Sequence, residues 1–262
     1  MDGCRGRDPS PPREAYVILA ILRIGAALGA FVLANSEASF AQSDDELFRR
    51  CFNSTIPHQV VDSCSVIITR TTTEKEDLAA AFKDRGIAYD DLGQYNLAMQ
   101  DFDRSIAIDP NDWDVYSSRG ITRIALKLYA LAIEDFSQAL RLNPSAYGVY
   151  SNRCFAMALL GDREAALIDC DRALHLKAGD PAALASRGFV KLLLKQYDSA
   201  IADYDGALKS RSDDPYSLYG RGAAKFRRGD LKGADADIVR AQGLRPDIAD
   251  YMAGLGIRLS TF

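Results

Sequence analysis

Histidine is scarce in this chain of 262 residues, and so is any excess of positive charge. The two histidines, His58 and His175, leave little material for a Ser-His-Asp or Cys-His catalytic arrangement. No CxxC or HxxxH spacing and no glycine-rich phosphate loop occurs, so we expect no metal site, no cofactor and no catalytic residues. Lysine and arginine total 32 against 36 acidic residues, which argues against a nucleic-acid partner because phosphate binding needs clustered cations.

Only one long apolar run occurs, near the N-terminus, which excludes a membrane protein with several spans. Residues 24–34 are uncharged and apolar, follow a weakly basic stretch and precede the small-x-small sequence Ser39-Phe40-Ala41. These are the parts of a secretory signal, so we expect residues 1–41 to be a signal peptide and the protein to be periplasmic or secreted in a bacterium. The alternative is an uncleaved inner-membrane anchor over residues 15–34, and membrane contact is expected only through this segment.

The rest of the chain repeats with a period of 34 residues, without insertion or deletion. The repeats are residues 79–112, 113–146, 147–180, 181–214 and 215–248. Counting positions from the start of each repeat, position 20 is always alanine, position 8 is glycine in four repeats and position 24 is large in four. Small residues where two helices approach, with large residues beside them, predict a pair of packed helices in every repeat.

This pattern resembles the tetratricopeptide repeat, which has the same period and small residues at positions 8, 20 and 27. The resemblance implies an all-α fold, a right-handed α-solenoid of five helix-turn-helix repeats over residues 74–248. Glycine at position 15 predicts a left-handed turn between the two helices in three repeats: Gly93, Gly161 and Gly229. Proline at position 32 predicts the end of the second helix in three: Pro110, Pro144 and Pro246. The chain departs from the family at position 11, where only Tyr89 is aromatic.

A stack of repeats exposes apolar faces at its ends, so caps are expected there. We expect residues 42–73 to form a helical hairpin that opens with a capping box at Ser43-Asp44-Asp45-Glu46. A second capping box, Thr73-Glu74-Lys75-Glu76, predicts the start of the first repeat helix near Glu74. Residues 249–262 are predicted to form a short C-terminal capping helix. Its apolar stripe would be Tyr251, Leu255 and Leu259.

Four cysteines lie beyond residue 41, an even number. In repeat 3, positions 8 and 24 are Cys154 and Cys170, two medium side chains in place of the glycine and the large residue found elsewhere. The joint change indicates that the two sites touch and favours a disulfide. Cys51 and Cys64 lie in the predicted N-terminal hairpin, and a bridge between them would contribute about 3 kcal/mol. The alternative is four buried free thiols acting as small apolar residues.

Position 7 is arginine and position 23 is aspartate in all five repeats. The residues are Arg85, Arg119, Arg153, Arg187 and Arg221, with Asp101, Asp135, Asp169, Asp203 and Asp237. A guanidinium can bind a carboxylate through two hydrogen bonds, so we expect a structural ladder of ion pairs within a repeat or between neighbouring repeats. The alternative is an arginine column that binds an anionic partner.

The family resemblance implies that the first helix of each repeat lines the concave side of the array. Its groove positions are mostly apolar in this chain, and the expected partner groove is Ile87, Ile121, Ile124, Asn152, Phe155, Leu159, Phe189, Leu192, Leu193 and Phe226. Family grooves that bind acidic C-termini carry lysine, arginine and asparagine there. Only Lys83, Asn152 and Arg227 match, and they are scattered, so no carboxylate clamp is expected. The alternative is that part of this column packs one repeat against the next.

These features favour a non-catalytic adaptor that holds a protein or peptide segment in an apolar groove. A second interpretation is a structural protein of the cell envelope that associates with further copies of itself as a homo-oligomer. A third is a carrier of a small apolar ligand. The sequence does not identify the partner.

Overall fold

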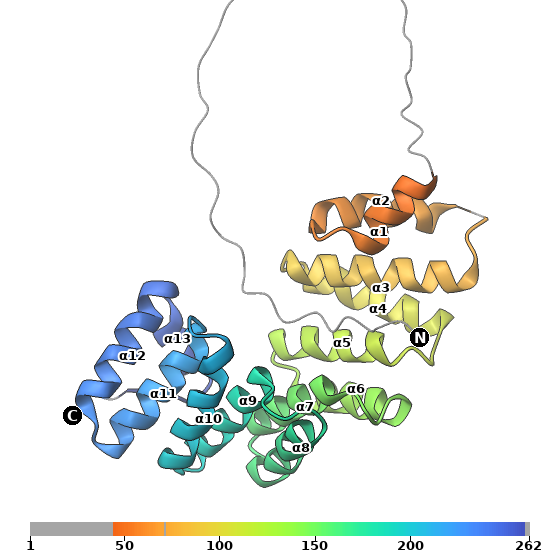
Figure 1. The fold of residues 1–262 in the computed structure, drawn as a ribbon. Helices are drawn as coiled ribbons and strands as arrows, with labels where there is room; N and C mark the ends of the chain where they lie inside the picture. Colours follow the sequence, from red (N-terminus) through yellow and green to blue (C-terminus); the bar gives the residue numbers. More distant parts are fainter. Residues whose placement is uncertain (1–43, 71, 260–262) are drawn as a thin grey trace, which may run out of the picture.

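The structure is a computed structural model that describes residues 44–70 and 72–259. Thirteen α-helices and no strands lie in these two ranges, so the predicted all-α fold is confirmed. Figure 1 shows the helices stacked as antiparallel pairs in chain order, along a curved path from the orange pair to the blue pair. The predicted signal peptide or anchor, residues 1–41, and the start of the first capping box at Ser43 lie outside the described residues.

The helices follow the 34-residue register predicted from the sequence. An N-terminal hairpin is formed by α1 (Asp44–Asn53) and α2 (Pro57–Thr69). The first helices of the repeats are α3 (Lys75–Asp91), α5 (Trp113–Ala125), α7 (Tyr147–Leu160), α9 (Pro181–Leu193) and α11 (Pro215–Arg228). The second helices are α4 (Tyr95–Ile108), α6 (Tyr129–Leu142), α8 (Arg163–Leu176), α10 (Tyr197–Ser210) and α12 (Leu231–Leu244). The last helix is α13 (Ile248–Gly254).

The direction of curvature follows from which helices touch. Each first helix contacts the first helix of the next repeat, whereas no two second helices of the described chain come into contact. In a curved stack, the elements on the inside of the bend are the ones that approach each other. The first helices therefore form the inner face of the array and the second helices form the outer face, as the family resemblance implies.

The turn between the two helices of a repeat places position 15 in the left-handed region. Glycine occupies it in three repeats, with φ of 70°, 106° and 96°. In repeats 2 and 4 the same site is occupied by Lys127 and Lys195, at φ of 60° and 63°. A side chain is unfavourable in this region because its Cβ crowds the following carbonyl oxygen. The turn is thus set by the helix pair and not by glycine alone.

Each repeat is closed by contact between positions 8 and 24. A Cβ added at Gly86 would lie 2.7 Å from the ring of Phe102, so only glycine lets the two helices approach this closely. In repeat 3 the pair is Cys154 and Cys170, both fully buried and joined by a disulfide, with their Cα atoms 5.5 Å apart. The cross-link takes the place of the missing ring. A second disulfide joins Cys51 to Cys64 in the N-terminal hairpin.

Two details of the predicted caps are wrong. The hydroxyl of Thr73 does not cap α3; it donates a hydrogen bond of 2.8 Å to the carbonyl oxygen of Ile67, and α3 begins at Lys75 without a side-chain cap. The C-terminal helix is also shorter than expected, because it ends at Gly254 and Gly256 turns the chain at φ 90°. Leu255 and Leu259 still pack on the core from beyond the helix.

Candidate functional site

The ladder of arginines and aspartates runs through the whole array. In every repeat, Nε and Nη2 of the arginine donate to the two oxygens of the aspartate sixteen residues later, at 2.6–3.0 Å. The remaining Nη1 reaches the preceding repeat, as in the bonds from Arg119 to Asp103 and from Arg153 to Ser137, at 2.5 and 3.0 Å. Each arginine therefore ties the two helices of its own repeat to the unit before it, which for Arg85 is the N-terminal hairpin through Ser65. Its donors are directed into the array.

Position 11, where the chain departs from the family, carries a second cation for the same carboxylates. Arg123, Lys191 and Lys225 lie 2.8, 2.6 and 2.8 Å from the aspartate at position 23 of their own repeats. Burial by itself raises the pKa of Asp237, but hydrogen bonds from Arg221 and Lys225 outweigh it and leave that pKa below its ordinary value. The sequence contained this signal, because a basic residue replaced the family's aromatic in three repeats.

Two residues of the predicted groove lie in the hydrophobic core instead. Phe189 is 4% exposed and Leu192 is 7% exposed. The ring of Phe189 packs on the ring of Phe155 with centroids 5.2 Å apart, because α7 and α9 lie close together along their length. In this half of the array, the inner column joins one repeat to the next. Phe189 and Leu192 therefore do not line an open groove.

The inner face is more open over repeats 1 to 3, because α5 contacts α3 and α7 at only a few residues. Ile121 on α5 is 42% exposed, and Ala125 one turn later is also exposed. The other predicted groove residues are partly buried: Ile87, Ile124, Asn152, Phe155, Leu159, Leu193 and Phe226. The first helices thus present exposed and half-buried apolar side chains at these positions.

The three residues that resemble a carboxylate clamp do not converge. The Lys83 ammonium lies 2.8 Å from Asp112 and 3.5 Å from Asp114, so its charge is balanced within the array. Arg227 donates to the carbonyl oxygen of Arg258 at 2.8 Å, at the far end of the inner face. The three positions belong to three different repeats. They give no common site for a terminal carboxylate.

A polar contact that the sequence did not predict joins the first helices of repeats 1 and 2. The hydroxyl of Thr122, which is fully buried, donates to Oδ1 of Asp90 at 2.5 Å and so links α5 to α3. Burial raises the pKa of Asp90 above its ordinary value; this hydrogen bond lowers it in part, and the charge of Asp91 raises it again. A carboxylate of elevated pKa thus joins the first helices of repeats 1 and 2.

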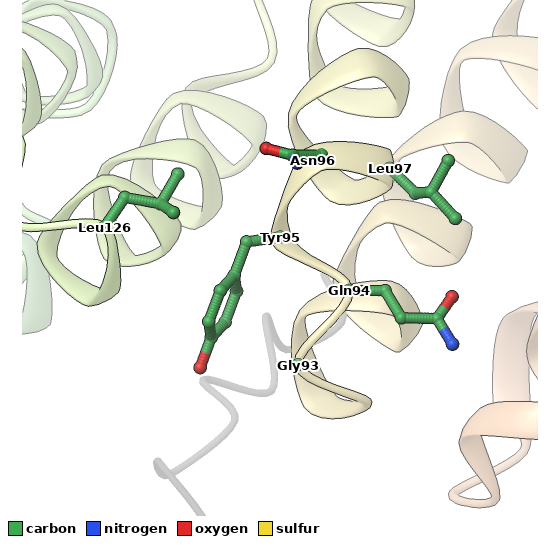
Figure 2. Close-up of a pocket in the computed structure, with 6 residues that line it drawn as sticks. All are labelled: Gly93, Gln94, Tyr95, Asn96, Leu97 and Leu126. Atoms are coloured by element: carbon green, nitrogen blue, oxygen red, sulfur yellow. The ribbon is translucent and has the colours of Figure 1, made fainter.

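A small hollow of about 200 Å³ lies where the turn between α3 and α4 meets the end of α5. Figure 2 shows Tyr95 on the side of Leu126, with Leu97 and Gln94 pointing the other way. Ligand pockets usually exceed this size and have convergent polar groups, so the hollow is a surface feature of the turn. Among residues 44–70 and 72–259 no cluster of His, Cys, Asp and Glu is placed to hold a metal ion. No helix in the same ranges has the length and hydrophobicity to span a membrane.

Two family models, both described as tetratricopeptide repeat, match the chain: one matches residues 79–112 and the other matches residues 114–145. The first match has the bounds predicted for repeat 1. No curated protein sequence matches the chain significantly.

Several solved structures share the fold. A thermophilic TPR protein of Thermus thermophilus is 23% identical, with a TM-score of 0.59, over 68% of this chain and 97% of that one. YrrB, described as a TPR protein with an unusual peptide-binding site, is 18% identical, with a TM-score of 0.51, over 71% and 94%. The Cut9–Hcn1 hetero-tetramer of the APC/C is 16% identical, with a TM-score of 0.69, over 80% and 41%. The 34-residue register, the paired helices and these matches show that the chain contains tetratricopeptide repeats, which typically occur in non-catalytic scaffolds.

Proposed function

We propose that this protein is a non-catalytic adaptor that holds a segment of a partner protein on the inner face of repeats 2 and 3. The observation that carries the proposal is Ile121, which is 42% exposed on α5, with half-buried Phe155 and Leu159 on the next first helix, α7. Apolar side chains in an open concave position favour a partner's apolar side chains, which leave water on binding. The peptide-binding site named for YrrB, which shares the fold, supports the same use of this scaffold.

The test is site-specific photo-crosslinking in intact cells. We expect p-benzoylphenylalanine in place of Ile121 to form a crosslink to a discrete partner protein. The matched control is the same replacement of Ile168, a 71% exposed isoleucine on the outer helix α8, which should give no such product. The proposal fails if the two positions crosslink equally, or if only position 168 does.

We further propose that the adaptor works in an oxidising compartment, the bacterial periplasm or the exterior. Two buried disulfides and the signal-like sequence of residues 1–41 support this, because structural disulfides are rare in reducing cytosol. Intact mass of protein taken from the envelope fraction should show no alkylation of Cys51, Cys64, Cys154 or Cys170 until reductant is added. Four cysteines alkylated without reductant would contradict the assignment.

A second function, self-association, is favoured by exposed apolar side chains on the last full helix, α12. Leu231, Val239 and Leu244 are 63%, 59% and 47% exposed, and the short α13 covers α12 far less than a full first helix covers each earlier second helix. A second copy docked there would bury these side chains. Mass measured by light scattering should then rise with concentration and fall back in a Val239→Asp variant. A monomer at all concentrations removes this alternative.

A further inference from the structure

The stacked helix pairs give the array two long edges. The turns between paired helices lie along one edge, the turn edge: residues 53–59, 91–97, 125–131, 159–165, 193–199 and 227–233. The connections between successive repeats lie along the other, the connection edge: residues 108–114, 142–148, 176–182, 210–216 and 244–250. Two small hollows place successive turns side by side. The α1–α2 turn and the end of α3 line one, and the α3–α4 turn and Leu126 line the other (Figure 2).

Exposed apolar side chains gather on the turn edge. Among the described residues, six large apolar side chains are exposed there, whereas only Leu176 and Leu244 are exposed on the connection edge. The six are Ile56, Leu97, Leu128, Leu131, Leu160 and Leu231, with exposed fractions of 50%, 41%, 43%, 40%, 54% and 63%. Every unit except repeat 4 therefore presents at least one apolar side chain to solvent on the same edge.

The two edges also differ in charge. The turn edge contains six basic and five acidic residues, whereas the connection edge contains three basic and eight acidic residues. An anionic surface would therefore repel the connection edge and not the turn edge. Charge and apolar exposure both favour the turn edge as the side that approaches such a surface.

The turn of repeat 2 is the most apolar part of this edge. Residues 124–133 contain a single charged side chain, Lys127, between Leu126 and Leu128. Lys127 is exposed and adopts a φ of 60°, in a position where three repeats have glycine. Local rules are most often broken where a function requires it. A lysine among leucines keeps its apolar stem with them and extends its ammonium group to a polar layer.

Separate apolar side chains on successive turns suit a lipid surface better than a protein surface. Packed helices lie about 10 Å apart, so the leucines of successive turns are separated by about that distance. A stable protein interface needs about 800 Å² of closely matched surface on each partner. Acyl chains are fluid and close around each inserted side chain, so a bilayer needs no matching shape.

We propose that the turn edge rests on the surface of a lipid bilayer. The leucines of repeats 1 to 3 enter the boundary between headgroups and acyl chains, and Lys127 lies at the level of the lipid phosphates. The inner face stays uncovered, because it runs along the helices and not across their ends. This contact goes beyond the proposed function and does not depend on the groove.

The test uses vesicles of phosphatidylcholine and phosphatidylglycerol with brominated acyl chains, which quench a tryptophan that enters them. The single tryptophan of the chain, Trp113, is the first residue of α5 and lies on the connection edge. In a Trp113→Phe background, Leu128→Trp should fluoresce about twofold less on these vesicles than on unbrominated vesicles of the same composition. The matched control Leu176→Trp, in the same background, and the parent chain should fluoresce equally on both.

A second variant tests the cation. Lys127→Glu, added to the Leu128→Trp chain, should reduce the quenching about twofold on vesicles with phosphatidylglycerol and less on pure phosphatidylcholine, because only the anionic lipid attracts the ammonium group. Both side chains are exposed on a turn, so all variants should unfold at the same urea concentration. Every variant contains the full chain, so any binding through residues 24–34 is common to them, and the quenching reports one position.

Equal quenching at positions 128 and 176, or quenching at neither, overturns the proposal. So does a tryptophan at position 128 that ignores brominated lipid but moves to shorter emission wavelength as protein concentration and mass rise together, because the edge then binds a second copy. Photo-crosslinking at Ile121 is independent of these results, so failure of the lipid contact and failure of the groove are distinguishable.

Discussion

The two halves of the inner face use one repeat position in opposite ways. Position 9 is Ile121 in repeat 2, where the side chain is 42% exposed, and Phe189 in repeat 4, where it is 4% exposed. The helix pairs around the two residues are alike, but α9 lies against the first helix α7 along its length, whereas α5 contacts the first helices α3 and α7 at only a few residues. The repeat thus fixes the helix pair. How closely successive first helices approach decides whether the column is core or surface.

The largest expected effect comes from truncating this position in the closed half. Phe189→Ala should lower the free energy of unfolding by about 3–5 kcal/mol, because it removes a buried ring and leaves a cavity beside Phe155. Ile121→Ala should cost less than about 1 kcal/mol, because the side chain already faces water. Urea unfolding of both variants measures the two losses in free energy. Equal losses would show that the two halves do not differ as described.

The next largest effect is expected at the disulfide of repeat 3, which takes the place of the large side chain that closes the other repeats. Changing Cys154 and Cys170 together to alanine should cost about 3 kcal/mol, from the lost cross-link of a loop of this size. The control variant, Cys154→Gly with Cys170→Phe, rebuilds the pair found in repeats 1 and 2 and should recover part of the loss. Calorimetry of the two variants compares them. A rebuilt repeat no more stable than the double alanine would contradict the equivalence of ring and bridge.

Ionisation of a carboxylate should contribute to the free energy of unfolding with opposite sign in the two halves. The pKa of Asp237 is below its unfolded value, so it contributes stability above about pH 4 that is lost as pH falls through the folded pKa. Asp237→Asn should therefore lower the free energy of unfolding by about 2 kcal/mol at pH 7 and by less in acid.

The pKa of Asp90 is raised, chiefly by burial, so its ionisation opposes folding. Asp90→Asn should therefore be neutral or stabilising at pH 7. Urea unfolding from pH 7 to pH 3 measures both, and a constant gap for Asp237→Asn would contradict the pairing.

The smallest expected effect is at the left-handed turns. Lys127→Gly and Lys195→Gly should each raise the free energy of unfolding by about 0.5–1 kcal/mol, because glycine tolerates a φ near 60°. Gly161→Ala at the same position of repeat 3 should lower it by a similar amount. Thermal unfolding of the three variants gives the comparison, and no gain at either lysine would mean that the turn stores no strain.

Most of the fold could be predicted because the period was unbroken. The contact of positions 8 and 24 followed from their joint change to Cys154 and Cys170, and the pairing of positions 7 and 23 followed from their constancy. Thr73 was assigned to a cap because it fitted a local motif, but the hydroxyl bonds the end of the preceding helix. A local sequence motif does not show which other backbone groups lie within reach of the side chain in the fold.

The candidate site could be predicted only in part. Ile121 and Phe189 occupy equivalent positions and are both apolar, so no periodic pattern distinguishes an exposed side chain from a buried one. The distance between successive first helices depends on packing through all the layers.

Titration of an uncharged synthetic peptide of about twelve residues, with a leucine- and alanine-rich centre and glutamine at both ends, against matched variants tests the central claim most directly. We expect Ile121→Asp to raise the dissociation constant of this peptide at least about tenfold, Ile168→Asp on the outer helix α8 to leave it unchanged, and both variants to unfold at the same urea concentration. An unchanged affinity for Ile121→Asp, or equal losses at the two positions, would show that the open half of the inner face is not where the segment binds.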